Sequence, residues 1–122
     1  MLASSRMNGF VPTTGSDAAR RFYEGVLGFT FASDNEYVVT LRAGQSTIYM
    51  QKLKEFTPAK YTILGWEVED IRKVVSFLIE RGVAFERIGW MEQDELGIWK
   101  SPEGYVAWFK DPDGNVLSVS QH

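Results

Sequence analysis

Few residues in this chain could do acid–base or metal chemistry. It has no cysteine, and its single histidine is His122, the last residue. Thiolate chemistry is therefore excluded, and an imidazole site would need the C-terminus to fold inward. Glu67 is the carboxylate with the best claim to catalysis, because it stands near the end of an expected strand, where burial could make it a general acid or base. The competing interpretation is that Glu67 is simply exposed to solvent.

Two helices are expected to position these residues. Two segments carry apolar side chains at the spacing of one helical face: Ala19, Phe22, Tyr23, Val26 and Leu27 in the first, and Ile71, Val74, Val75, Leu78 and Ile79 in the second. Ser16 or Asp17 is expected to cap the first helix and Asp70 the second. Gly28 and Gly82 are expected to end them in the left-handed conformation.

Strand-like segments surround each helix in the same order. One precedes each helix and three follow it: residues 7–14, 29–32, 36–42 and 46–53 in the first half, and 61–68, 83–88, 105–110 and 115–120 in the second, which also has a shorter stretch at 96–99. This predicts two βαβββ modules, about residues 7–54 and 60–121, after a disordered tail of residues 1–6. Because neither half could cover its own sheet, the modules are expected to form one α+β domain over residues 7–121.

Composition excludes several classes of function. The 122 residues carry a formal charge of −3, and no basic stripe is present, so a nucleic-acid partner is not expected. No apolar run approaches the roughly 20 residues of a membrane span, and the first ten residues lack the apolar core of a secretion signal. We therefore expect a cytoplasmic protein with no membrane partner.

Three stretches resemble one known family: "AARRFYEGVLGF", "VEDIRKVVSFLIERGV" and "VAWFKDPDGNVLSV". The turn with an aromatic residue ahead of Asp-Pro-Asp-Gly-Asn is the most specific of them. The chain resembles the vicinal oxygen chelate superfamily, which includes glyoxalases, bleomycin-resistance proteins and extradiol dioxygenases. The resemblance implies two curved mixed sheets around a cavity, helices outside, and a homodimer.

The same resemblance implies where metal ligands would stand. They fall on Asn8, Ile63 and Ser118, and on Tyr49 or one of the two residues after it. Isoleucine cannot bind a metal, and asparagine, serine and tyrosine are poor ligands for a divalent ion without imidazole or carboxylate partners. We therefore expect no metal and no cofactor.

Strand alternation and the resemblance together indicate what would line the cavity instead. The predicted ligand-binding residues are Asn8, Phe10, Tyr49, Gln51, Ile63, Val106, Trp108, Ser118 and Ser120. They combine aromatic and apolar walls with a few directional polar groups, as a site for a small organic molecule does. The sequence thus predicts a metal-free protein that sequesters an aromatic or cationic ligand.

Other interpretations stay open at this point. One is a glyoxalase-like lyase, isomerase or dioxygenase with a divalent metal at a displaced site, and another is metal-free acid–base catalysis by Glu67. Ser118 and Ser120 could be plain fillers, and no neighbouring base could make either a nucleophile. The stretch from Trp90 to Trp99 could form the rim of the site, an edge of the dimer or a surface loop.

Overall fold

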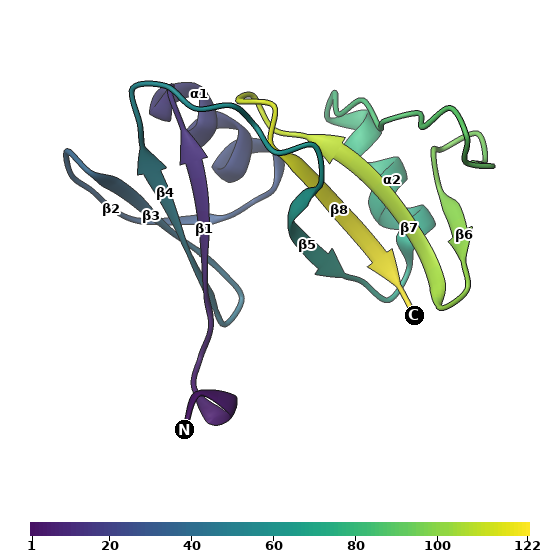
Figure 1. The fold of residues 1–122 in the computed structure, drawn as a ribbon, viewed down its shortest axis with the longest axis horizontal. Helices are drawn as coiled ribbons and strands as arrows, with labels where there is room; N and C mark the ends of the chain where they lie inside the picture. The colour runs from purple at the N-terminus through teal and green to yellow at the C-terminus, as the bar shows by residue number, and fades with distance from the viewer. The chain divides into compact units, whose positions relative to one another are not determined.

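The chain folds into two compact units, Met1–Thr57 and Pro58–His122, in a computed structural model that describes residues 1–122 (Figure 1). Each unit contains one four-stranded mixed sheet. The predicted α+β class is therefore confirmed. Neither of the longer helical segments has the length and apolarity needed to cross a lipid bilayer.

The first unit follows the predicted order of strands and helix. Its elements are η1 (Leu2–Ser4, a 3-10 turn), β1 (Asn8–Thr13), α1 (Ser16–Arg20), η2 (Arg21–Val26, a π-helix), β2 (Thr30–Asp34), β3 (Val38–Ala43) and β4 (Ser46–Lys52). The strand order is β1-β4-β3-β2, with β1 parallel to β4 and the other neighbours antiparallel.

The second unit repeats this topology. Its elements are β5 (Thr62–Glu67), α2 (Ile71–Glu80), β6 (Trp99–Ser101), β7 (Gly104–Lys110) and β8 (Val116–Gln121). The strand order is β5-β8-β7-β6, and β5 is parallel to β8. The expected strand at residues 83–88 does not form, and only an isolated bridge joins Phe85 to Phe109. The N–H of Glu86 donates to the carbonyl of Trp108 at 2.7 Å, but the Gln93 side chain occupies the carbonyl of Glu86 and the N–H of Ile88, so pairing with β7 does not continue past Glu86.

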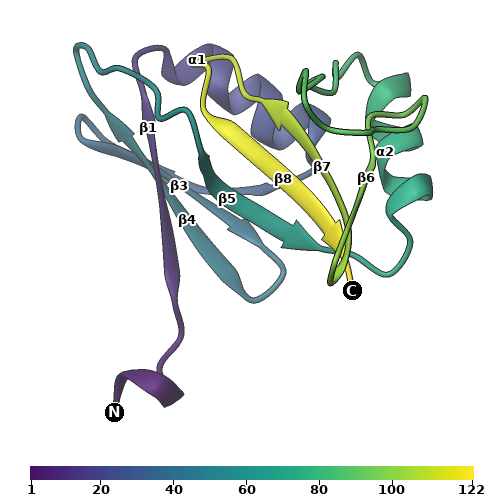
Figure 2. The same ribbon diagram turned by 45° about the vertical axis from the view of Figure 1, so that its right-hand side comes forward.

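One face of each sheet is buried and the other is open. The buried side chains are Val11, Val39, Leu41, Ile48 and Met50 in the first unit, and Ala107, Phe109, Leu117 and Val119 in the second. In the second unit, α2 contributes Ile71, Val75 and Leu78 to the core and contacts β7 and β8; it is drawn behind β7 in Figure 1 and to the right of β7 in Figure 2. Because side chains alternate along a strand, the residues between these buried positions lie on the open face.

The predicted helix ends are confirmed for the second helix and partly for the first. Asp70 Oδ1 accepts a hydrogen bond from the N–H of Lys73 at 3.1 Å, which is an N-cap contact. Gly28 and Gly82 have φ of 80° and 93°, the left-handed region that favours glycine. The prediction that Ser16 or Asp17 caps the first helix was wrong. Gly15 is the N-cap, and it makes no side-chain capping bond.

The Asp-Pro-Asp-Gly-Asn turn sets the register of the last two strands. Asp111 Oδ1 accepts hydrogen bonds from the N–H groups of Asp113 and Asn115, at 2.9 and 3.0 Å. Asn115 Nδ2 donates to Asp111 Oδ2 at 2.9 Å, and both side chains are buried. Gly114 has a φ of 87°, which completes the tight connection. The turn therefore holds β7 beside β8, with Trp108 paired to Ser118.

Candidate ligand-binding site

Four of the predicted site residues share the open face of the second sheet. In the β7–β8 register, Trp108 pairs with Ser118 and Val106 with Ser120. Paired residues on neighbouring strands project to the same side of a sheet. The neighbouring residues of these strands, such as Ala107 and Leu117, are fully buried on the opposite face. This open face is the candidate site of the second unit.

Three tryptophans form a row on this face. The rings of Trp99 and Trp108 lie 6.1 Å apart with 32° between their planes. The rings of Trp90 and Trp99 meet edge to face at 6.5 Å and 74°. Trp99 pairs with Val106 across β6 and β7, which places it on the same side as Trp108. Trp90 is 77% exposed, so the row ends in a ring that is open to solvent.

The sequence analysis did not assign Trp90 and Trp99 to the site. Trp99 could have been found from the pairing of its short strand with β7, since period-two alternation then gives its side. Trp90 carried no such signal, because it stands in a segment without helix or strand.

A bulge changes which residue of β5 meets the tryptophan row. Thr62 pairs with Val116 and Leu64 with Leu117, so Ile63 is the extra residue between them. The indole Nε1 of Trp108 donates a hydrogen bond to Thr62 Oγ1 at 3.1 Å. Ile63 is half-buried at the bulge. Thr62 is thus a polar member of this face that simple alternation did not identify.

At Gly65, in the middle of the open face, no side chain projects from the sheet. It pairs with Ser118, and a Cβ atom at Gly65 would lie 2.7 Å from Ser118 Oγ, closer than real Cβ contacts. Without a side chain at this position, the hydroxyl of Ser118 lies beside bare backbone. A flat molecule lying against Trp108 could therefore approach the sheet closely here.

The first unit carries its own group of predicted residues. Phe10 pairs with Tyr49 across β1 and β4, and their rings stack at 5.4 Å with 29° between the planes. Phe10 is 57% exposed. A hollow of about 560 Å³ is lined by Phe10, Tyr37, Val38, Tyr49, Gln51, Lys52 and Leu53. Asn8 is exposed at the start of β1 and does not line this hollow.

Glu67 lacks the surroundings that a catalytic carboxylate needs. Its side chain is 72% exposed, and Oε1 lies 3.5 Å from Nε2 of His122. A general acid or base is usually tuned by burial or by close charges. An exposed carboxylate at the end of a strand is solvated by water, so the geometry gives Glu67 no support as a catalyst.

An ion-pair cluster joins α2 to the loop that carries Trp90. Partial burial raises the pKa of Asp94, but hydrogen bonds from the N–H groups of Ile98 and Leu96 and the charge of Arg72 outweigh it. The pKa of Asp94 therefore lies below its usual value. The hydrogen bond from Arg72 likewise lowers the pKa of Glu95. Both carboxylates are thus kept in their charged forms.

Comparison with known proteins now identifies the family. Residues 10–119 match the model of the Glyoxalase/Bleomycin resistance protein/Dioxygenase superfamily. The chain belongs to this superfamily. No curated protein matches the sequence.

Solved structures of the superfamily share the fold. A glyoxalase family protein from Bacillus anthracis is 18% identical with a TM-score of 0.76, and the match covers 98% of this chain and 95% of that one. TnmS3, an antibiotic binding protein from Streptomyces sp. CB03234, is 23% identical with a TM-score of 0.74, covering 99% and 98%. Lactoylglutathione lyase from Agrobacterium tumefaciens is 16% identical with a TM-score of 0.75, covering 97% and 93%.

The metal that the superfamily implies does not fit the residues of this chain. The implied ligand positions carry Asn8, Tyr49, Ile63 and Ser118. Ile63 has no donor atom, and the Tyr49 ring stacks on Phe10. No group of three His, Cys, Asp or Glu side chains is placed to hold a metal ion. Divalent ions in proteins need several imidazole, thiolate or carboxylate ligands, so this donor set is unsuitable.

Proposed function

We propose that this member of the superfamily binds a flat organic molecule, aromatic or cationic, on the open faces of its sheets and without a metal ion. The observation that carries the proposal is the row Trp90–Trp99–Trp108. Exposed aromatic rings supply stacking area for a planar ligand and attract cations to their faces. Thr62 and Ser118 beside Trp108 supply the directional polar groups that such a site needs.

The proposed contacts extend the predicted set. The ligand-binding residues are Asn8, Phe10, Tyr49, Gln51, Ile63, Val106, Trp108, Ser118 and Ser120, to which the structure leads us to add Thr62, Trp90 and Trp99. The proposal is consistent with the antibiotic binding role named for TnmS3, whose fold this chain shares at 23% identity. Binding without a chemical step is the activity that we assign.

Titration with a planar dye tests the proposal. Proflavine is a flat tricyclic cation, and 8-anilinonaphthalene-1-sulfonate is an aromatic anion, so the pair separates stacking from charge. Protein free of nucleic acid is titrated with each dye while tryptophan emission is followed. We expect saturable quenching by proflavine. Quenching that rises linearly without saturation with both dyes would contradict the proposal.

Elemental mass spectrometry tests the metal-free part of the proposal. Protein purified without an affinity tag or chelator is analysed for zinc, nickel, iron and manganese. We expect far less than one ion per chain. About one divalent ion per chain would favour the alternative function, a lyase, isomerase or dioxygenase with a displaced metal site.

The proposal also includes a second copy of the chain as partner and a cytoplasmic location. Both rest on the sequence analysis. Light scattering coupled to size-exclusion chromatography tests the first, and fractionation of source cells tests the second.

A further inference from the structure

Side chains, not regular structure, fix the shape of the loop that carries Trp90, residues 86–98. Gln93 Nε2 donates to the carbonyls of Glu86 and Gly97, at 3.0 and 2.8 Å. Gln93 Oε1 accepts from the N–H of Ile88 at 2.8 Å. One side chain thus ties together three places along the loop. The loop is therefore folded on itself, and its position relative to α2 depends on the contacts that join the two.

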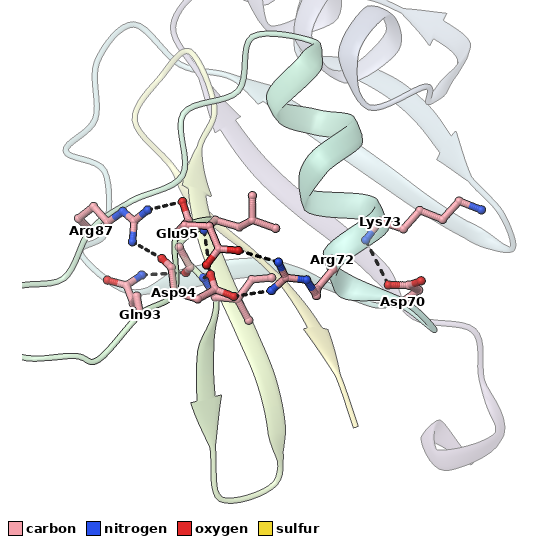
Figure 3. Close-up of polar contacts among 10 residues, drawn as sticks. Asp70, Arg72, Lys73, Arg87, Gln93, Asp94 and Glu95 are labelled. Atoms are coloured by element: carbon pink, nitrogen blue, oxygen red, sulfur yellow. Dashed lines mark hydrogen bonds and ion pairs between the residues drawn. The ribbon is translucent and has the colours of Figure 1, made fainter.

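Two arginines from different elements contact Asp94 and Glu95. Within the loop, the Arg87 guanidinium donates to the carbonyl oxygens of Asp94 and Glu95. From α2, Arg72 Nη1 reaches Asp94 Oδ2 at 2.8 Å and Nη2 reaches Glu95 Oε1 at 2.7 Å. Figure 3 shows Arg72 extending from its helix to both carboxylates, with Arg87 on their other side. Arg72 therefore links the loop to the helix.

Asp94 also connects this link to the rest of the loop. Its Oδ1 accepts from the N–H groups of Leu96 and Ile98, both at 2.9 Å. The carboxylate that meets Arg72 with one oxygen thus orders the loop backbone with the other. The chain runs from there into Trp99, which begins β6.

We propose that Arg72, with Asp94 and Glu95, is a positioning clamp that holds Trp90 against Trp99 and so sets the affinity for planar ligands. This inference rests on the proposed function. Trp90 is mostly exposed, and its ring meets the rest of the tryptophan row through one edge-to-face contact with Trp99, so that contact depends on where the loop places the ring. Without the clamp, Gln93 and Arg87 still keep the loop folded on itself, but the link to α2 is lost and Trp90 moves more freely.

The expected effect is moderate. Arg72 is 58% exposed and Glu95 is 72% exposed, and exposed ion pairs are weak and screened by salt. Loss of the clamp should therefore weaken binding by about two- to fivefold and leave the fold intact.

The experiment compares Arg72→Gln with Lys73→Gln. Lys73 is the next residue of α2, is exposed, and points away from the acidic pair in Figure 3, so its replacement removes the same charge without touching the clamp. Glu95→Gln tests the partner, and the double variant with Arg72→Gln tests whether the two act together. Each protein is measured twice: acrylamide quenching of tryptophan emission without ligand, and proflavine titration.

The clamp predicts that Arg72→Gln raises quenching and weakens proflavine binding, that Lys73→Gln changes neither, and that the double variant is no worse than Arg72→Gln alone. Quenching and affinity equal to wild type in Arg72→Gln would overturn the clamp, as would an equal effect in Lys73→Gln. If wild-type protein bound no proflavine, the proposed function would fail and the role of the clamp in affinity with it. Quenching in the ligand-free protein would still decide whether Arg72 positions Trp90.

Discussion

Trp108 and Trp66 lie on opposite faces of the second sheet and have different environments. Trp108 is half-buried on the open face, where its indole binds Thr62 and neighbours Trp99. Trp66 stacks on the buried Phe109 at 6.2 Å, which places it with the core. Trp108 thus lies on the open face that we propose binds the ligand, and Trp66 lies on the core side of the same sheet.

Replacement of Trp108 by alanine should weaken proflavine binding by about 1 to 3 kcal/mol, the scale of a lost aromatic wall. Trp66→Ala is the matched control and should lower the melting temperature while the folded fraction keeps its affinity. Binding is read from fluorescence titration and stability from thermal melts. If Trp108→Ala lowers only stability, Trp108 is a core residue and not a ligand wall.

Alternation predicted which residues share the open face where the strands are regular and failed where they are not. Val106, Trp108, Ser118 and Ser120 stand on two regular strands, so the predicted shared face is the observed one. Thr62 was missed because the bulge in β5 breaks the alternation. Trp90 was missed because its position depends on hydrogen bonds between residues that no local pattern connects.

At the scale of elements, Gly28 and Gly82 end the two helices, because each adopts a left-handed conformation that redirects the chain. Gly82 has a φ of 93°, and no atom stands within 4 Å of where its Cβ would be. A side chain there would be strained by the backbone conformation alone.

Gly82→Val should therefore lower the free energy of unfolding by about 1 to 2 kcal/mol. Gly25→Ala is a suitable control, because Gly25 also has free space around its Cβ but no positive φ. Alanine in a helical segment should be neutral or slightly stabilising there. Urea denaturation measures both variants. Equal midpoints for Gly82→Val and wild type would show that the left-handed cap is not needed.

The clamp predicts a defined response to acid. The pKa values of Asp94 and Glu95 lie below their ordinary values of 3.8 and 4.5 because Arg72 and backbone N–H groups favour the charged forms. Groups with lowered pKa in the folded protein contribute stability above their ordinary pKa and lose it as the pH falls through the lowered value. The loop should therefore stay attached to α2 through Arg72 from neutral pH down to about pH 5, and this attachment should weaken below about pH 4.

Acrylamide quenching of tryptophan emission as a function of pH measures this transition. In Arg72→Gln the link to α2 is absent at every pH, so quenching should already be raised at neutral pH and should change less between pH 5 and pH 4 than in wild type. Arg87 contacts only backbone oxygens of these residues and should not replace Arg72. Identical pH profiles for the two proteins would contradict the clamp.

The repeated order of elements made the topology predictable, and local competition explains the exception. Two helices with the same apolar spacing and the same flanking strands produced two sheets of equivalent strand order. A strand was expected at residues 83–88, but the side chain of Gln93 bonds to the N–H of Ile88 and the carbonyl of Glu86 and so replaces part of the pairing with β7. The pattern of neighbouring residues does not show that a side chain further along the chain will compete for the hydrogen bonds of a strand.

At the scale of the whole molecule, the open sheet faces expose large apolar side chains. Phe10, Tyr37 and Trp90 are among them. Exposed aromatic surface of this kind is typical of ligand sites and of interfaces between subunits. We expect a homodimer, with light scattering giving about twice the 13.9 kDa mass of one chain. A monomer across the whole concentration range would contradict this expectation and leave the open faces to the ligand alone.

The most direct test of the central claim is a proflavine titration of protein dialysed against a chelator, with Trp108→Ala alongside. We expect saturable quenching of tryptophan emission that the chelator does not weaken, and a clear loss of affinity in the variant. Binding that appears only after a divalent ion is added back would contradict it, as would equal affinity in the variant.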